Sequence, residues 1–138
     1  MVTPPALPPG PRGARSSRVL VVDDEPLIRW SVSETLRHEG YSVGEAEDAR
    51  SALNAVRDAG SPFAVIVLDV RLPDSDGLSL LARLHRTLAD TRIILMTAHG
   101  TPEMSEGAFA LGAYGVMNKP FGMADIAQMV DRAAGVPA

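Results

Sequence analysis

The apolar and polar residues of this chain alternate between two repeating patterns. Short apolar runs, rich in β-branched residues, are typical of strands and recur at regular intervals. A run at 63–68 is apolar at every position, which is typical of a central parallel strand covered on both faces. The run at 41–46 is more polar and predicts a strand near an edge. Five strands are expected, at 18–22, 41–46, 63–69, 92–97 and 113–117.

A helical pattern follows each of these runs. Ile28, Val32 and Leu36 recur at every fourth position and give the first helix one apolar stripe. Asp48 and Asp76 stand where side chains commonly cap the first turn of a helix. The expected helices cover about 26–39, 49–60, 77–88, 102–111 and 123–134. Strands that alternate with crossover helices predict an α/β fold, a (βα)5 parallel sheet with helices on both faces.

Composition narrows the class of protein. The chain has 138 residues, enough for one domain with a core, and 46% of them are apolar. It has no cysteine, which excludes disulfides and thiolate zinc sites. The net charge of -4 argues against a direct nucleic-acid-binding surface, and no apolar run reaches the roughly 20 residues of a membrane span.

The first 17 residues differ in composition from the rest. They are rich in proline, glycine and arginine, and predict a disordered N-terminal tail before a domain at 18–134. A docking arm for an acidic partner is the alternative interpretation of this tail. Residues 135–138 are expected to form a short C-terminal tail, and no output domain is expected after the last helix.

Polar residues follow the ends of the expected strands. Asp23 and Asp24 follow the first strand, Asp69 ends the third, Thr97 ends the fourth and Lys119 follows the fifth. Parallel strands bring these ends to one edge of a sheet, where ligands usually bind. Carboxylates gathered there repel one another unless a cation compensates, and Mg²⁺ prefers such oxygen ligands. The pattern therefore predicts a magnesium-dependent phosphoryl acceptor.

Four motifs carry a resemblance to a known family. "VVDDEP", "VLDVRLPDSDG", "ILMTAHG" and "NKPF" occur in this order, and together they resemble the response-regulator receiver domains of bacterial two-component systems. The sequences of these motifs are most similar to those of receivers of the nitrogen-regulator type. The resemblance implies a flavodoxin-like fold with strand order 2-1-3-4-5 and a cytoplasmic location.

The resemblance also implies roles for the acidic residues. Asp69 matches the phosphoacceptor. Asp24 and Asp69 match direct Mg²⁺ ligands, joined by the main-chain carbonyl of Arg71, while Asp23 acts largely through metal-bound water. Mg²⁺ is therefore the expected cofactor.

Other matched positions concern the phosphoryl group after transfer. Lys119 matches the cation that pairs with a phosphoryl oxygen, and Thr97 matches the hydroxyl that moves toward it. The bond from Lys119 to Pro120 is expected to be cis. Arg71 and His99 flank the mouth of the site and are candidates for tuning the lifetime of the phosphorylated form, although His99 equally fits a solvated loop residue.

The implied function is signalling rather than metabolic catalysis. A histidine kinase or histidine phosphotransfer protein donates the phosphoryl group, and the domain assists its own phosphorylation and dephosphorylation. The group then switches a surface formed by the fourth helix, the fifth strand and the fifth helix. That surface is expected to bind an output partner or a second copy of the chain.

One position departs from the family pattern. Receivers usually carry an aromatic residue three positions before the lysine, where this chain has Val116. Either Tyr114 takes over part of that role or the aromatic switch is absent, and core packing of Tyr114 fits both. The departure is the one feature that favours an alternative function, an interaction module that works without phosphorylation. A dehalogenase-type phosphatase would need an Asp-x-Asp pair where this chain has Asp23 and Asp24 adjacent.

Overall fold

The computed structural model describes residues 17–136, which form a five-stranded parallel sheet. Its strands lie in the order β2-β1-β3-β6-β7. Without the two short strands β4 and β5, this order corresponds to the predicted 2-1-3-4-5, and the polar strand β2 lies at an edge as expected. The bounds are Arg18–Val22 for β1, Ser42–Ala46 for β2, Val65–Asp69 for β3, Arg92–Thr97 for β6 and Gly115–Asn118 for β7.

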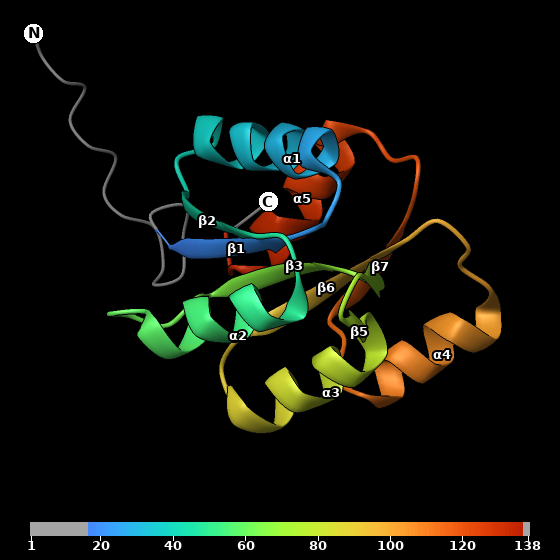
Figure 1. The fold of residues 1–138 in the computed structure, drawn as a ribbon. Helices are drawn as coiled ribbons and strands as arrows, with labels where there is room; N and C mark the ends of the chain where they lie inside the picture. Colours follow the sequence, from blue (N-terminus) through green and yellow to red (C-terminus); the bar gives the residue numbers. More distant parts are fainter. Residues whose placement is uncertain (1–16, 137–138) are drawn as a thin grey trace, which may run out of the picture.

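Five helices cover the two faces of this sheet. Figure 1 shows α1 and α5 on one face and α2, α3 and α4 on the other. The helices are α1 Pro26–His38, α2 Ala49–Asp58, α3 Gly77–Thr87, α4 Pro102–Ala110 and α5 Met123–Ala133. The predicted doubly wound α/β fold is thus confirmed. No helix within residues 17–136 is long and apolar enough to cross a membrane.

Strand side chains alternate between two separate buried clusters. Val19 and Val21 belong to the cluster under α1 and α5, whereas Leu20 and Val22 belong to the cluster under α2, α3 and α4. This alternation follows from the two-residue period of a strand. Because both faces are covered, β1 is apolar from Val19 to Val22 and β3 from Val65 to Leu68, and Asp69 is the last residue of β3 at the edge of the sheet.

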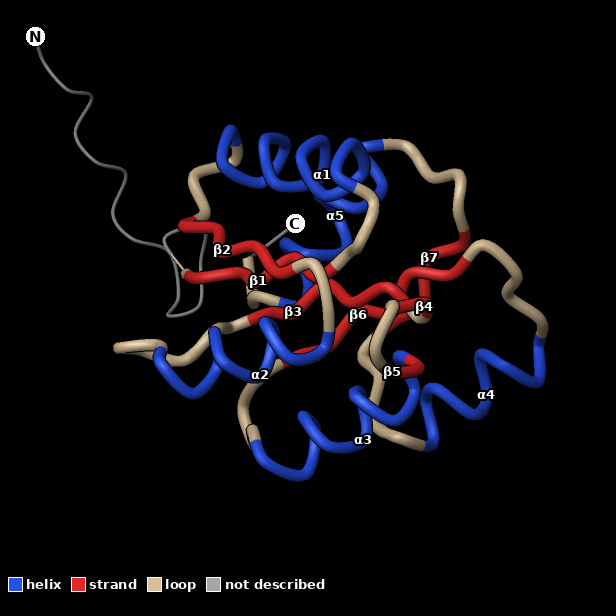
Figure 2. The backbone as a smooth tube through the Cα atoms, in the orientation of Figure 1, coloured by secondary structure: helices blue, strands red, loops and turns tan. Residues whose placement is uncertain are grey.

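The structure differs from the predicted pattern in the loop after β3. Two short strands, β4 (Arg71–Leu72) and β5 (Ser75–Asp76), pair there in an antiparallel hairpin that is visible in Figure 2. Two-residue strands have no periodicity that a sequence can reveal. Strand β3 begins at Val65 rather than at residue 63, since the preceding Pro62 offers no N–H and Phe63 packs in the core.

The predicted helix caps are present, and an additional one is found. The Asp76 carboxylate accepts a hydrogen bond from Ser79 N at 2.8 Å, and the Asp48 carboxylate accepts one from Ser51 N at 2.7 Å. The additional cap is Asp74, whose two carboxylate oxygens accept from the first two N–H groups of α2, at 2.8 and 3.0 Å. The β4–β5 hairpin is therefore tied to the start of α2.

The predicted tails lie largely outside the described residues. Residues 1–16 and 137–138 are not described, so neither the N-terminal tail at 1–17 nor the end of the chain is tested. Of the expected C-terminal tail, Gly135 adopts a positive φ of 82° after α5, and Val136 N donates to Asp131 O at 2.8 Å. These two residues therefore close the end of α5.

Candidate phosphoryl-acceptor site

Three carboxylates meet at the carboxyl edge of the sheet. Asp23 and Asp24 follow β1, and Asp69 ends the neighbouring β3. Each offers an oxygen within 4.8 Å of the other two. Asp23 is completely buried and Asp69 is 4% exposed, whereas Asp24 lies at the surface. The sheet topology therefore brings together the acids that the sequence singled out.

Lys119 is the cation closest to these acids. Its Nζ lies 3.2 Å from Asp23 Oδ2 and 3.2 Å from Asp69 Oδ2, and 3.6 Å from Glu25 Oε1. The main-chain N of Lys119 donates to Thr97 O at 2.7 Å, which extends the β6–β7 pairing by one residue. The Lys119–Pro120 bond is cis, as expected.

Charge at this edge is only partly compensated. Burial raises the pKa of Asp23, and the neighbouring Asp69 raises it further, although the Glu25 N–H and Lys119 act in the opposite direction. Burial lowers the pKa of Lys119, but its ion pairs with Asp23 and Asp69 outweigh this effect and raise it overall. One ammonium group therefore faces several carboxylates, and the site favours additional positive charge.

The donor set suits a hard divalent cation. Carboxylate oxygens from two adjacent strands converge, and burial together with the charge of Asp69 raises the pKa of Asp23 although Lys119 lies beside it. Mg²⁺ binds oxygen ligands and is commonly held by one or two carboxylates with water. The three aspartates fit such an ion.

Backbone N–H groups hold the carboxylates in place. Glu25 N donates to Asp23 Oδ1 at 2.9 Å, and Arg71 N donates to Asp69 Oδ1 at 3.2 Å. The loop that carries Arg71 lies close to the start of α3, where a Cβ on Gly77 would lie 2.5 Å from Val70 Cα. Only glycine fits there, so the "DG" that follows the acceptor strand fixes the path of the chain around the site.

Sequence reasoning missed the contribution of Arg29. This residue of α1 donates from Nη1 to Asp23 O at 2.7 Å and from Nε to Glu45 Oε1 at 3.2 Å. It therefore connects the acidic loop to α1 and to β2. The signal that could have indicated Arg29 is its position, because it is a basic residue in the first turns of the helix that follows an acidic loop.

Thr97 and the flanking residues lie around an open pocket of about 450 Å³ above Asp69. Thr97 is 2% exposed, and its Oγ1 accepts a hydrogen bond from His99 N at 3.2 Å. Arg71 and His99 are exposed and line this pocket. The lining also includes Asp24, Glu25, Val70, Ala98, Met104 and Lys119.

Tyr114 is not at this pocket. Its side chain is 39% exposed, so its interpretation as a core residue was wrong. The Arg92 guanidinium lies 5.8 Å from the centre of its ring, and Arg92 begins the strand that Thr97 ends. Tyr114 therefore lies toward the opposite edge of the sheet from Thr97. Val116 is partly buried and packs against the cluster under α2, α3 and α4.

Comparison with known proteins agrees with this geometry. Residues 19–131 match the model of the family described as "Response regulator receiver domain". The chain belongs to this family. Receiver domains of two-component systems thus account for the acidic edge, the fold and the four sequence motifs together.

Curated relatives of this receiver include regulators of the nitrogen-regulator type. It is 37% identical over 120 residues to the C4-dicarboxylate transport transcriptional regulatory protein DctD of Pseudomonas aeruginosa, covering 87% of this chain and 26% of that protein. It is 32% identical over 119 residues to the DNA-binding transcriptional regulator NtrC of Proteus hauseri, covering 86% and 25%. The receiver thus spans about a quarter of the length of these relatives.

Solved structures of receivers have the same fold. A beryllofluoride-activated NtrC4 receiver domain dimer is 36% identical, with a TM-score of 0.78, over 84% of this chain and 94% of that one. A CheY-like receiver from Methanospirillum hungatei is 28% identical, with a TM-score of 0.80, over 86% and 93%. The resemblance seen in the motifs is therefore confirmed for both sequence and fold.

Proposed function

We propose that this receiver accepts a phosphoryl group from a phosphohistidine onto Asp69. The observation that carries the proposal is the position of Asp69. Its nearly buried carboxylate lies 3.2 Å from Lys119 Nζ, and it also lines an open pocket beside Thr97. A phosphoryl donor can reach this carboxylate from the pocket, and the cation beside it can stabilise the charge of the transferring group. Asp69 therefore has the features of a nucleophile for phosphoryl transfer. The donor is a histidine kinase or a histidine phosphotransfer protein.

The proposed transfer moves one phosphoryl group from the donor histidine to Asp69. An Asp69 carboxylate oxygen attacks phosphorus in line, an acyl phosphate O–P bond forms, and the P–N bond to the donor histidine breaks. The histidine leaves as imidazole and takes up a proton. We assign Lys119 to pair with a phosphoryl oxygen and Thr97 to donate its hydroxyl to another. Water later attacks phosphorus, the acyl phosphate O–P bond breaks, and inorganic phosphate leaves as the Asp69 carboxylate is regenerated. The domain thus assists both steps of its own cycle.

Mg²⁺ is the proposed cofactor. Asp24, Asp69 and the main-chain carbonyl of Arg71 would hold it directly, with Asp23 acting largely through bound water. When bound, it supplies positive charge that neutralises the oxygens of the transferring group. The fit of the donor set described above supports this assignment.

The proposed output surface comprises α4, β7 and α5. Thr97 ends β6, which pairs with β7, so a movement of Thr97 toward a phosphoryl group acts next to this surface. Its partner is an output protein or a second copy, and the similar NtrC4 receiver, which was solved as a dimer, supports the second. As in the family, we place the chain in the cytoplasm, with residues 18–134 as the receiver and 1–17 as a tail.

Val116 favours one alternative, a receiver-like interaction module that does not use phosphorylation. Tyr114 lies toward the wrong edge of the sheet to replace the usual aromatic residue. In that case partner binding would be the same with and without a phosphate mimic. The presence of Asp69, Lys119 and Thr97 around one pocket supports the phosphoacceptor function instead.

Intact mass after incubation with acetyl phosphate and Mg²⁺ tests the proposal. We expect the wild type to gain one phosphoryl group and Asp69→Ala to gain none. The matched control is Asp76→Asn, which changes an exposed helix cap seven residues away and should leave the gain intact. A wild type that gains nothing, or an Asp69→Ala variant that still gains the group, contradicts the assignment.

A further inference from the structure

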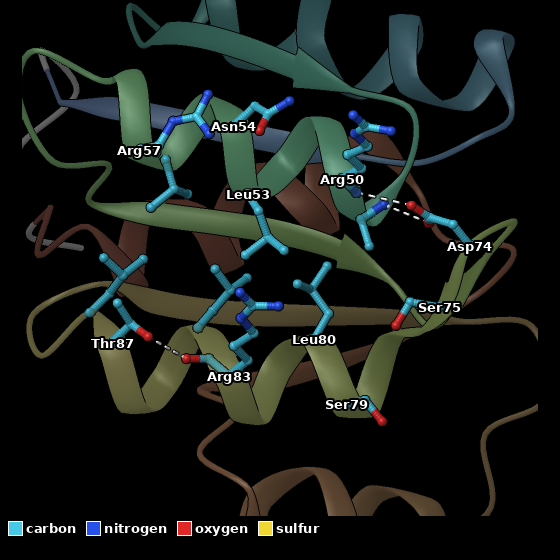
Figure 3. Close-up of a pocket in the computed structure, with 14 residues that line it drawn as sticks. Arg50, Leu53, Asn54, Arg57, Asp74, Ser75, Ser79, Leu80, Arg83 and Thr87 are labelled. Atoms are coloured by element: carbon cyan, nitrogen blue, oxygen red, sulfur yellow. Dashed lines mark hydrogen bonds between the residues drawn. The ribbon is translucent and has the colours of Figure 1, made fainter.

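A groove between α2 and α3 is not part of the phosphoryl-acceptor site. It has a volume of about 830 Å³ and is shown in Figure 3. Its floor is apolar: Leu80 is 3% exposed and Leu84 is 1% exposed, and Leu53, Val56 and Leu88 are partly buried beside them. Leu53 and Leu80 face each other across the groove from opposite helices. Leu53, Val56 and Leu88 therefore supply the apolar surface that remains accessible from outside.

The rim of this groove is basic although the chain as a whole is acidic. Arg50 and Arg57 stand on the α2 side, and Arg83 extends from α3 into the groove (Figure 3). Within residues 17–136 the side chains of Arg50 and Arg83 make no hydrogen bond or ion pair, while Arg57 pairs with Asp58 at 2.9 Å. The rim of the groove is therefore locally positive, although the chain as a whole has a net charge of -4.

The acidic side chain that lines the groove does not neutralise these arginines. Both oxygens of Asp74 accept hydrogen bonds from N–H groups of α2, at 2.8 and 3.0 Å. The carboxylate is thereby directed at the end of the helix and closes one end of the groove. The other polar side chains of the lining are neutral, namely Asn54, Ser75, Ser79 and Thr87.

The shape of the groove selects a helix as its occupant. Its walls are helices of 10 and 11 residues, so they are about 15 Å long at 1.5 Å per residue. The backbone groups of the walls are paired within the helices, so an extended peptide would find no strand edge to pair with. An amphipathic helix of two to three turns instead buries its apolar stripe without needing backbone partners.

Two other occupants fit less well. The N-terminal segment of this chain carries Arg12, Arg15 and no acid, so the arginine rim would repel it. A second copy would have to insert one of its own helices, such as the acidic α4. That contact joins two different surfaces, so it gives a closed ring only for particular rotations between copies and an open filament otherwise.

We propose that the α2–α3 groove binds an acidic amphipathic helix of another protein. Apolar residues of that helix, spaced by three and four positions, contact Leu53 and Leu88, and flanking carboxylates pair with Arg50 and Arg83. The site is separate from the α4–β7–α5 surface and does not depend on phosphorylation of Asp69. Its short walls place the contact among the small, transient interfaces.

A peptide library tests this proposal without requiring the natural partner. Random 14-residue peptides displayed on phage are selected on the full chain and then counter-selected on the Arg50→Glu/Arg83→Glu double variant. We expect the recovered peptides to carry Asp or Glu around apolar residues at helical spacing. Synthetic copies should lose at least tenfold in affinity for the double variant and no more than twofold for Arg86→Glu, an exposed arginine of α3 outside the groove.

Four results would overturn the proposal. The first is that no recovered peptide loses tenfold on the double variant. The second is an equal loss on Arg86→Glu, which would indicate general charge attraction. The third is that amide chemical shift changes of the labelled chain map outside α2 and α3. The fourth is concentration-dependent self-association by light scattering that the double variant abolishes, which would make a second copy the occupant. Thermal melting confirms that each variant is folded.

Discussion

The two edges of the same sheet differ in how their polar groups are satisfied. At the amino edge, Thr91 Oγ1 donates to Phe63 O at 2.7 Å, and Arg18 donates to Ser61 O at 2.7 Å with its guanidinium 4.5 Å from the centre of the Phe63 ring. At the carboxyl edge, Asp23 and Asp69 share Lys119 and retain excess negative charge.

This difference separates stability from function within one set of strands. The amino edge pairs each of these groups with a nearby partner, and so contributes to stability alone. The carboxyl edge gathers buried like charges, which reduces stability and, under the proposed function, favours a cation and a phosphoryl group. Changes at the two edges should therefore have opposite consequences, as the following four predictions specify, beginning with the largest effect.

Removal of Mg²⁺ should have the largest effect, and only at the carboxyl edge. With excess EDTA at constant ionic strength, we expect the rate of phosphorylation by acetyl phosphate to fall more than about a hundredfold, since a bound metal supplies several kcal/mol of charge stabilisation. The time course of intact mass measures this rate. A rate unchanged by EDTA would show that Lys119 alone compensates the charge.

Thr91→Val should affect only the amino edge. The substitution keeps the side-chain shape but removes the donor to the buried Phe63 carbonyl, so we expect a loss of about 1–2 kcal/mol in the free energy of unfolding. Urea denaturation gives the stability, and the phosphorylation rate should stay within twofold of wild type. A slower phosphorylation would mean that the two edges are coupled.

Asp23→Asn should stabilise the metal-free protein while weakening the site. The substitution removes one of the buried like charges, so we expect a gain of about 1 kcal/mol in the free energy of unfolding without Mg²⁺. Binding of Mg²⁺, measured by titration calorimetry, should become weaker.

The free energy of unfolding of wild type and of Asp23→Asn should also depend differently on pH. Burial and Asp69 raise the pKa of Asp23 above its ordinary value of 3.8, so the folded state holds this proton more tightly than the unfolded state. Asp23 therefore lowers wild-type stability as the pH rises from 3.8 through the higher folded pKa, and the variant should lack this contribution. Asp90→Asn, an exposed aspartate near the amino edge, is the control and should behave as wild type.

Arg29→Ala should have the smallest effect. Arg29 donates to the main-chain carbonyl of Asp23 rather than to its carboxylate. We therefore expect a loss of about fivefold in Mg²⁺ affinity, which is below the 10–100-fold loss typical for residues that hydrogen-bond directly to a ligand side chain. Arg37→Ala is the matched control, because Arg37 also pairs with Glu45 but makes no contact with Asp23. Equal losses in the two variants would assign the effect to surface charge.

Much of the fold could be predicted because it depends on local patterns. The uninterrupted apolar run before Asp69 predicted the central position of β3, and the polar run at 41–46 predicted an edge strand; both are confirmed. The β4–β5 hairpin and the start of β3 could not be predicted in this way. They depend on pairing partners and on the packing of Phe63, which are set by residues distant in sequence.

The candidate site was predictable for a related reason. A parallel sheet places all carboxyl ends at one edge, so the order of strands and the residues after them were enough to bring Asp23, Asp24, Asp69, Thr97 and Lys119 together. Arg29 was not predicted because its contact with Asp23 depends on how α1 lies over the loop. Tyr114 was misjudged because the expected strand at 113–117 included it, whereas β7 begins at Gly115 and Tyr114 lies exposed before it.

The sequence by itself determined the elements and the set of residues at the carboxyl edge, because these follow from short-range periodicity and from strand ends, while the family resemblance implied the order of the sheet. Only the tertiary structure decided how far Lys119 compensates the acids, that Asp74 ties the hairpin to α2, and that an arginine-rimmed groove lies between α2 and α3. These features depend on distances between side chains far apart in the sequence, which are set only when the helices pack on the sheet.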